Sequence, residues 1–144
     1  MAIWQVDLHL VVCGSDTRAN VGVDWHPPQL SPDTVLPVQR MLSAGFGVPW
    51  LMLEDWIVFG PENGNRVDIA FEVDGRASVV MRFDIRNSGI QFETLVCRVA
   101  KQEGCVFFSP DLGILVEPEP RLIEAALEKA HTDAVLKNLN MSKG

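Results

Sequence analysis

The fold is decided by residues 66–86, which read RVDIAFEVDGRASVVMRFDIR and alternate apolar and polar side chains on both sides of Asp74-Gly75. Such period-two alternation is typical of strands with one buried face, and Asp-Gly between two of them indicates a β-hairpin. The apolar residues of both strands are odd-numbered: Val67, Ile69, Phe71 and Val73, then Ala77, Val79, Met81, Phe83 and Ile85. Opposed residues share a face, so a strict two-residue turn is excluded and a three-residue loop is predicted.

Two registers of this hairpin satisfy the rule. If Val73 lies opposite Ala77, then Arg66 lies opposite Asp84, and the charged side chains form cross-strand pairs of about 0.2–1 kcal/mol each. The alternative register suits the glycine of the turn better, but it sets Arg66 against Arg82. We favour the first register on grounds of charge.

Outward from this hairpin, the patterns predict further strands and helices. Strands are expected at 3–13, 21–25, 49–59, 105–108 and 114–116, with the first two forming a hairpin, the third central in the sheet and the last two a small hairpin. Helices are expected over about 34–44, over about 89–103 after a capping-box pattern at Ser88, and from Pro120 to about Leu136 or Asn138. The first helix can begin at Asp33 or at Pro37.

The resulting order is ββαβββαββα. An order that mixes hairpins with helices predicts the α+β class, with an antiparallel or mixed sheet and about three helices packed on one face. We expect one domain over 1–144, because 144 residues suit one hydrophobic core and no linker or repeat interrupts the pattern. Residues 139–144 are expected to form a frayed tail.

Charge and composition exclude several classes of partner. The net charge of −7 repels phosphate backbones and anionic lipid, so neither nucleic acid nor a membrane is expected. No apolar run approaches the ~18–20 residues that cross a bilayer, and the first residues lack the features of a signal peptide. The cysteines Cys13, Cys97 and Cys105 suggest neither a disulfide framework nor a zinc site, which favours a cytoplasmic location.

Candidate catalytic residues lie in the first strand and just after the second. Asp7 and His9 are two apart on a strand and share a face, where a carboxylate and an imidazole could act as a general base or bind a metal. His26 could join them in one cleft. A polar outward stripe explains the first two residues equally well, so no metal site is assigned.

A second candidate site is a recognition surface. Asp24, Trp25 and His26 precede two prolines, and a rigid segment with an aromatic side chain can anchor a protein partner. Trp25 can equally be the last core residue of its strand. Cys13 with His26 could be drawn as a nucleophile and base, but no catalytic motif surrounds Cys13.

No cofactor is expected. The chain has no G-x-G-x-x-G or G-x-x-x-x-G-K-[ST] sequence, and its glycines read as single turn residues. The acids at 54, 55 and 62 have no partner acid or histidine at a defined offset, so they support no glycosidase or nuclease.

These observations favour a non-catalytic protein-binding domain of a small acidic cytosolic protein, in one form an inhibitor or immunity-type protein of a basic partner. The alternative is a small hydrolase-type enzyme with its site on the first hairpin, at Asp7, His9 and His26. Residues 1–60 carry only eight of the thirty-one charged side chains, so this charge-poor portion could also form a homodimer.

Overall fold

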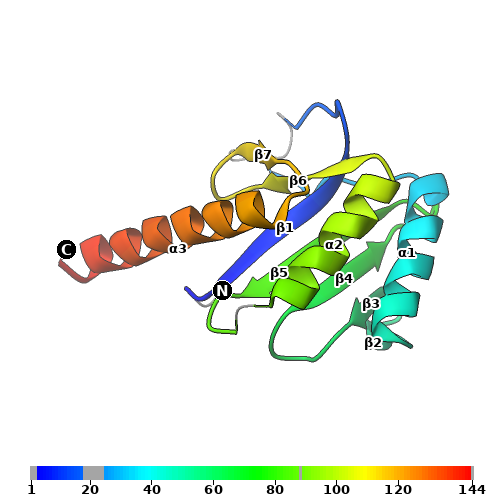
Figure 1. Ribbon diagram of the computed structural model, residues 1–144, viewed down its shortest axis with the longest axis horizontal. Coiled ribbons are helices and arrows are strands. Elements are labelled where there is room, and N and C mark those ends of the chain that lie inside the picture. Colours follow the sequence, from blue (N-terminus) through cyan, green and yellow to red (C-terminus); the bar gives the residue numbers. More distant parts are fainter. Residues whose placement is uncertain (1–2, 18–24, 88, 144) are drawn as a thin grey trace.

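The computed structural model describes residues 3–17, 25–87 and 89–143, and in these residues seven strands and three helices follow in the order βαββββαββα. The strands are β1 (Gln5–Val12), β2 (Trp50–Leu53), β3 (Trp56–Phe59), β4 (Arg66–Phe71), β5 (Ala77–Asp84), β6 (Cys105–Ser109) and β7 (Ile114–Val116), and the helices are α1 (Pro32–Phe46), α2 (Ile90–Gln102) and α3 (Pro120–Lys143). The strands form one antiparallel sheet in the order β2-β3-β4-β5-β1-β6-β7 (Figure 1). The predicted α+β class is therefore confirmed.

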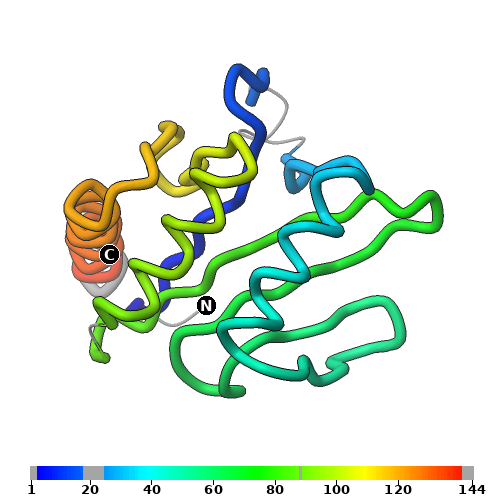
Figure 2. Tube along the Cα trace, turned by 45° about the vertical axis from the view of Figure 1, so that its right-hand side comes forward, coloured from blue at the N-terminus to red at the C-terminus, as the bar shows by residue number. Residues whose placement is uncertain are grey.

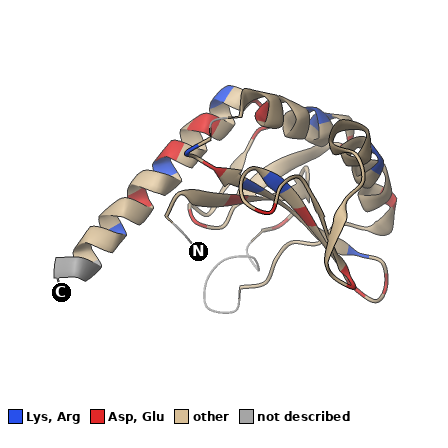
Figure 3. Cartoon of the chain, turned by 90° about the horizontal axis from the view of Figure 1, so that it is seen from below, with Lys and Arg blue, Asp and Glu red and all other residues tan. Residues whose placement is uncertain are grey.

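All three helices lie on one face of this sheet (Figure 3), and α2 lies between α1 and α3 (Figure 2). The alternation in β1, β4 and β5 aims one set of apolar side chains at the helices, where Leu8, Ile69 and Met81 are fully buried in the main core. On the other face, Val11, Val106 and Phe108 form a small separate cluster. Beyond the sheet, the second half of α3 projects away from the body of the molecule (Figure 1).

Strand β1 lies inside the sheet, and most of the segment predicted to form a hairpin with it, 21–25, lies outside the described residues. Among the described strands, β1 pairs with β5 through Gln5–His9 and with β6 through His9–Val12. Of the predicted second strand, residues 21–24 lie outside the described residues and Trp25 belongs to no strand. Farther on, Leu30 forms an isolated antiparallel bridge with Ala77 of β5.

The hairpin of β4 and β5 adopts the register that we did not favour. Arg66 lies opposite Arg82, and the loop closes through a hydrogen bond from the Glu72 N–H to the Arg76 carbonyl (2.7 Å). This register places Gly75 at the third loop position with φ of 89°, a conformation that glycine adopts without strain. Backbone geometry at the turn therefore outweighs the expected cross-strand charge pairs.

The predicted central strand over 49–59 is also wrong. Residues 49–59 form two strands, β2 and β3, joined by a turn at Glu54-Asp55, and β2 is an outer strand of the sheet. Two adjacent acids in an apolar run mark the turn, because charged side chains are rarely buried without partners. Leu51 and Leu53 of β2 are 67% and 60% exposed.

The helices begin and end close to the predicted positions. α1 begins at Pro32 after the N-cap residue Ser31, and it contains Pro37. The lost hydrogen bond falls on the carbonyl of the exposed Asp33, where water can replace it. α2 has Gly89 as its N-cap residue, and Ser88 of the predicted capping box lies outside the described residues.

α3 continues to Lys143, past the predicted end near Leu136 or Asn138, because no glycine or proline interrupts the helix before Gly144. The prediction of a frayed tail over 139–144 is therefore wrong for residues 139–143. None of the described helices is both long enough and apolar enough to cross a bilayer.

Candidate functional site

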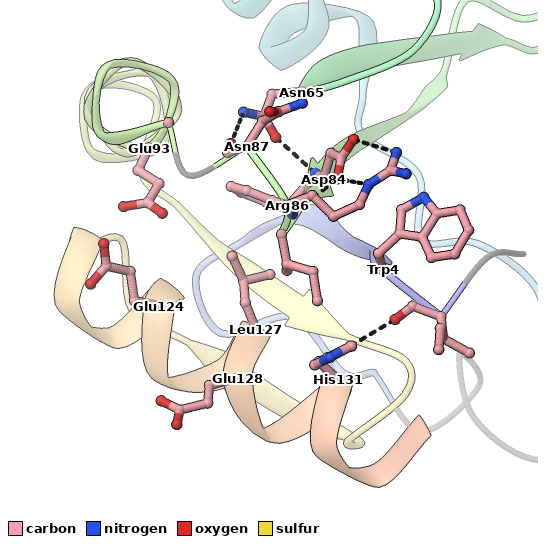
Figure 4. Close-up of a pocket in the computed structure, with 14 residues that line it drawn as sticks. Trp4, Asn65, Asp84, Arg86, Asn87, Glu93, Glu124, Leu127, Glu128 and His131 are labelled. Atoms are coloured by element: carbon pink, nitrogen blue, oxygen red, sulfur yellow. Dashed lines mark hydrogen bonds and ion pairs between the residues drawn. The ribbon is translucent and has the colours of Figure 1, made fainter. Parts of the chain in front are cut away.

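A cavity of about 530 Å³ lies between the first turns of α2, the first half of α3 and the end of β5 (Figure 4). Its apolar lining comes from Ile3, Phe83, Ile85 and Leu127. A volume of this size falls in the range of ligand-binding cavities, which combine an apolar lining with a few placed polar groups. Here the polar groups come from both helices and from the residues that flank β5.

Two carboxyl groups face each other across this cavity. Glu93, in the first turn of α2, and Glu124, on α3, point toward one another (Figure 4). Glu93 is only 4% exposed, and burial raises its pKa to about 7, with further contributions from the negative charge of Glu124 and a side-chain hydrogen bond with it. Glu93 therefore keeps its proton up to near-neutral pH.

The carboxyl pair has no neutralising cation among the described residues. None of the ion pairs of these residues involves Glu93 or Glu124, and Oε2 of Glu93 is buried without a hydrogen-bond partner. Glu128, one turn further along α3, adds a third acid to the lining. Buried polar groups are nearly always hydrogen-bonded, so this oxygen of Glu93 has the capacity to accept a further hydrogen bond at the cavity.

The opposite wall of the cavity is held rigidly by charged and amide groups. Arg86 binds the Asp84 carboxylate through Nε (3.0 Å) and Nη2 (2.9 Å), and its guanidinium lies 4.3 Å from the ring centroid of Trp4. The hydrogen bonds and charge of Arg86 lower the pKa of Asp84. Asn65 accepts a hydrogen bond from the Asp84 N–H (2.8 Å) and donates one to the Asn87 carbonyl (3.0 Å).

Two further contacts fix the shape of the cavity. Nδ1 of His131 on α3 lies 2.9 Å from the Ile3 carbonyl oxygen, which ties the start of the chain to the helix (Figure 4). Gly89 lies close to Asn65, because a Cβ atom at Gly89 would come within 2.7 Å of Asn65 Nδ2. The site is therefore preorganised by hydrogen bonds and by one close backbone approach.

Two of the residues predicted for catalysis, Asp7 and His9, lie elsewhere, on the face of the sheet opposite the helices. Asp7 forms an ion pair with Arg82 of β5, with Oδ1 and Nε 3.0 Å apart. His9 is 5% exposed and packs edge-on against Trp25, with ring centroids 5.8 Å apart. Burial lowers the pKa of His9, although the charge of Asp7 acts in the opposite direction.

His26 lines a separate hollow near the ends of β1 and β5, and neither Asp7 nor His9 lines that hollow. Of the predicted recognition surface, Trp25 is 42% exposed, whereas Asp24 lies outside the described residues. The hydrolase candidates are thus divided between the sheet face and the hollow.

Metal and thiol chemistry find little support in the described residues. Within 3–17, 25–87 and 89–143, no group of three or more His, Cys, Asp or Glu side chains is placed to hold a metal ion. Cys97 and Cys105 are buried, and burial raises the pKa of each thiol to about 11, which keeps both protonated near neutral pH. Cys13 is exposed.

Neither Glu93 nor Glu124 was among the residues predicted for a site. A signal was present, because Glu93, Val96, Cys97 and Ala100 are spaced i, i+3, i+4, i+7 and all four are buried on α2. A glutamate in such a stripe indicates a carboxyl group carried into the protein interior. Comparison of the chain with family models, with curated proteins and with solved structures found no significant match in any of the three.

Proposed function

We propose that the chain is a non-catalytic binding domain and that the cavity between α2 and α3 receives a positively charged side chain of a basic protein partner. The carboxyl pair of Glu93 and Glu124 is the observation that carries this proposal. A cation placed between the two groups would favour the ionised form of Glu93 and relieve the repulsion between the carboxylates. The unpartnered Oε2 of Glu93 would gain a charge-assisted hydrogen bond.

The apolar lining favours a cation on an aliphatic stem. A lysine side chain could lay its methylene groups against Phe83, Ile85 and Leu127 and bring its ammonium group to the carboxyl pair. Buried, well-packed anchors of this kind contribute most of the affinity in many protein interfaces. The net charge of −7 would steer a basic partner toward the domain.

The finer form of the proposal is an inhibitor or immunity-type protein that sequesters a basic enzyme. Long-range attraction between an acidic inhibitor and a basic enzyme speeds their association, which suits a protein that must neutralise its target quickly. We place this function in the cytoplasm, where the free thiols of Cys13, Cys97 and Cys105 would stay reduced. The hydrolase alternative has less support, since Arg82 already occupies the Asp7 carboxylate.

A titration with two small probes tests the recognition step. N-acetyl-lysine methylamide carries the proposed cation, and N-acetyl-norleucine methylamide has a similar stem without the charge. We expect the lysine probe alone to shift the backbone amide resonances of Glu93, Glu124 and Leu127 in ¹⁵N-¹H spectra. Its affinity should rise between about pH 5.5 and 8, because ligand binding competes with the proton on the carboxyl pair.

Matched variants identify the groups responsible. Glu93→Gln and Glu124→Gln should each weaken the lysine probe at least tenfold, whereas Glu54→Gln, an exposed acid on the turn between β2 and β3, should not. Equal shifts by both probes, or equal affinity of all three variants, would contradict the proposal. Crosslinking in cell extract then tests the partner: a basic protein should be recovered with the wild type and with Glu54→Gln but lost with Glu124→Gln.

A further inference from the structure

The acids that line the cavity between α2 and α3 carry more negative charge than the described residues around them neutralise. Asp84 is balanced by Arg86, which is the only lysine or arginine among the described residues of the lining. Glu93, Glu124 and Glu128 form no ion pair with any described residue. A single ammonium group placed between Glu93 and Glu124 would therefore leave Glu128 without a counter-charge.

The three unbalanced carboxyl groups follow one side of the cavity (Figure 4). Glu124 and Glu128 are four residues apart on α3, so their Cα atoms are separated by about 6 Å along the helix axis. Leu127 also lines the cavity, and it shares a face of α3 with Glu124 because residues three and four apart on a helix are neighbours. An aliphatic side chain thus accompanies two anionic positions that are one helical turn apart.

We infer that the cavity also binds a free aliphatic diamine, with one ammonium group between Glu93 and Glu124 and the other beside Glu128. This inference rests on the proposed recognition of a cation by the first two residues. The diamine and the lysine of a protein partner would need the same carboxyl pair, so they would exclude each other. A diamine would thereby regulate binding of the partner by competition.

The spacing fits a diamine with four methylene groups. Its five bonds, each about 1.5 Å long with angles of about 111°, place the two nitrogen atoms of the extended chain roughly 6 Å apart. This distance matches one turn of α3. The methylene groups could pack against Leu127 and Phe83, and the cavity volume of about 530 Å³ falls in the range that holds small organic ligands.

The two ends of the bound diamine would contribute unequally. Glu93 is 4% exposed, its Oε2 has no hydrogen-bond partner among the described residues, and its side chain points toward Glu124 (Figure 4). Glu128 is exposed. A charge-assisted hydrogen bond is strong in a buried place, whereas an exposed ion pair contributes little. The second ammonium group should therefore raise the affinity several-fold and not by orders of magnitude.

A titration with two matched amines tests the second ammonium group. Putrescine is the diamine with four methylene groups, and butylamine has a chain of the same length with one ammonium group. At pH 8 both amines are protonated, and Glu93, with a pKa of about 7, is mostly ionised. From the chemical shifts of the Leu127 amide, we expect putrescine to bind about five- to tenfold more tightly than butylamine. The two equivalent ends of putrescine alone give about a twofold gain, so a ratio no larger than that overturns the inference.

Two variants test the place of the second ammonium group. Glu128→Gln should lower the ratio of the two affinities to about two, because it removes the carboxylate of the outer end. Glu54→Gln also removes one exposed acid, but outside the lining, and it should keep the wild-type ratio. An unchanged ratio in Glu128→Gln, or an equal decrease in Glu54→Gln, would overturn the inference.

Competition separates this inference from the proposed function. Putrescine should displace the lysine probe, N-acetyl-lysine methylamide, and raise its apparent dissociation constant in proportion to the putrescine concentration. If the lysine probe binds at Glu93 and Glu124 but putrescine does not displace it, the diamine inference alone fails. If neither the lysine probe nor butylamine binds, the proposed function fails as well.

Discussion

Replacement of Glu93 by glutamine should stabilise the protein at alkaline pH and have little effect at acidic pH. The pKa of Glu93 rises from an ordinary value of 4.5 to about 7 in the folded protein, mainly because the side chain is buried. The folded state therefore holds a proton that the unfolded state has already released. The stability contributed by this proton is fully present below pH 4.5 and is lost as the pH rises through 7.

The size of the effect follows from the two pKa values. At about 1.36 kcal/mol per pKa unit, the wild type should lose on the order of 2–3 kcal/mol of unfolding free energy relative to Glu93→Gln between pH 5 and pH 8.5. For a domain of this length, such a difference corresponds to a Tm difference on the order of 8 °C. Glutamine resembles the protonated glutamate in shape and cannot ionise, so the variant isolates the proton.

Urea denaturation of both proteins at pH 5 and at pH 8.5 measures this difference. Glu128→Gln, which removes an exposed acid from the same lining of the cavity, is the control and should follow the wild type at both pH values. The reasoning would be refuted if the stability difference between Glu93→Gln and the wild type were the same at both pH values. It would also be refuted if Glu128→Gln reproduced the effect.

Three further predictions concern the fold. Gly75→Ala should destabilise the protein by about 1–2 kcal/mol in urea denaturation, because φ of 89° strains an alanine; no loss would contradict the turn geometry. Phe107→Ala should cost about 3–5 kcal/mol by the same assay, because Phe107 is fully buried; a cost below 1 kcal/mol would contradict its place in the core. In the folded protein at pH 8, a disulfide reagent that releases a coloured thiolate should react quickly with Cys13, which is exposed. Cys97 and Cys105 should react only after denaturant is added, because both are buried and their thiols stay protonated. Fast reaction of all three thiols would contradict the burial of Cys97 and Cys105.

The β4–β5 hairpin shows how far the sequence specifies the fold. Alternation predicted both strands and the three-residue loop, because the period of two is a property of the strand itself. The register was predicted wrongly, because the charges found partners outside the pair that we considered. Arg66 binds Asp68 on its own strand, and Arg82 binds Asp7 on β1, which is distant in the sequence.

The error at 49–59 has a related cause. Local patterns identify a strand but not its neighbours, and the central place of β1 depends on β5 and β6. At 49–59, the number of apolar residues concealed the turn at Glu54-Asp55. A charged pair inside an apolar run is better read as a break than as a buried feature.

The candidate site was not predicted because neither of its two glutamates belongs to a recognisable sequence motif. Glu93 and Glu124 lie on different helices, and nothing in their spacing along the chain predicts that they meet. Only the packing of α2 beside α3 brings the two carboxyl groups together. By contrast, Asp7 and His9 were predicted as a pair because residues two apart on one strand point to the same face.

The position of β1 between β5 and β6 has a consequence for biosynthesis. Gln5 pairs with Asp84 and His9 with Phe108, so β1 emerges from the ribosome long before either neighbouring strand exists. Until then, its apolar row at Val6, Leu8 and Leu10 has no native partner strand, and nascent chains in that condition are targets for chaperones. Closure of the sheet must wait for the last third of the chain, which implies slow folding dominated by contacts between distant residues.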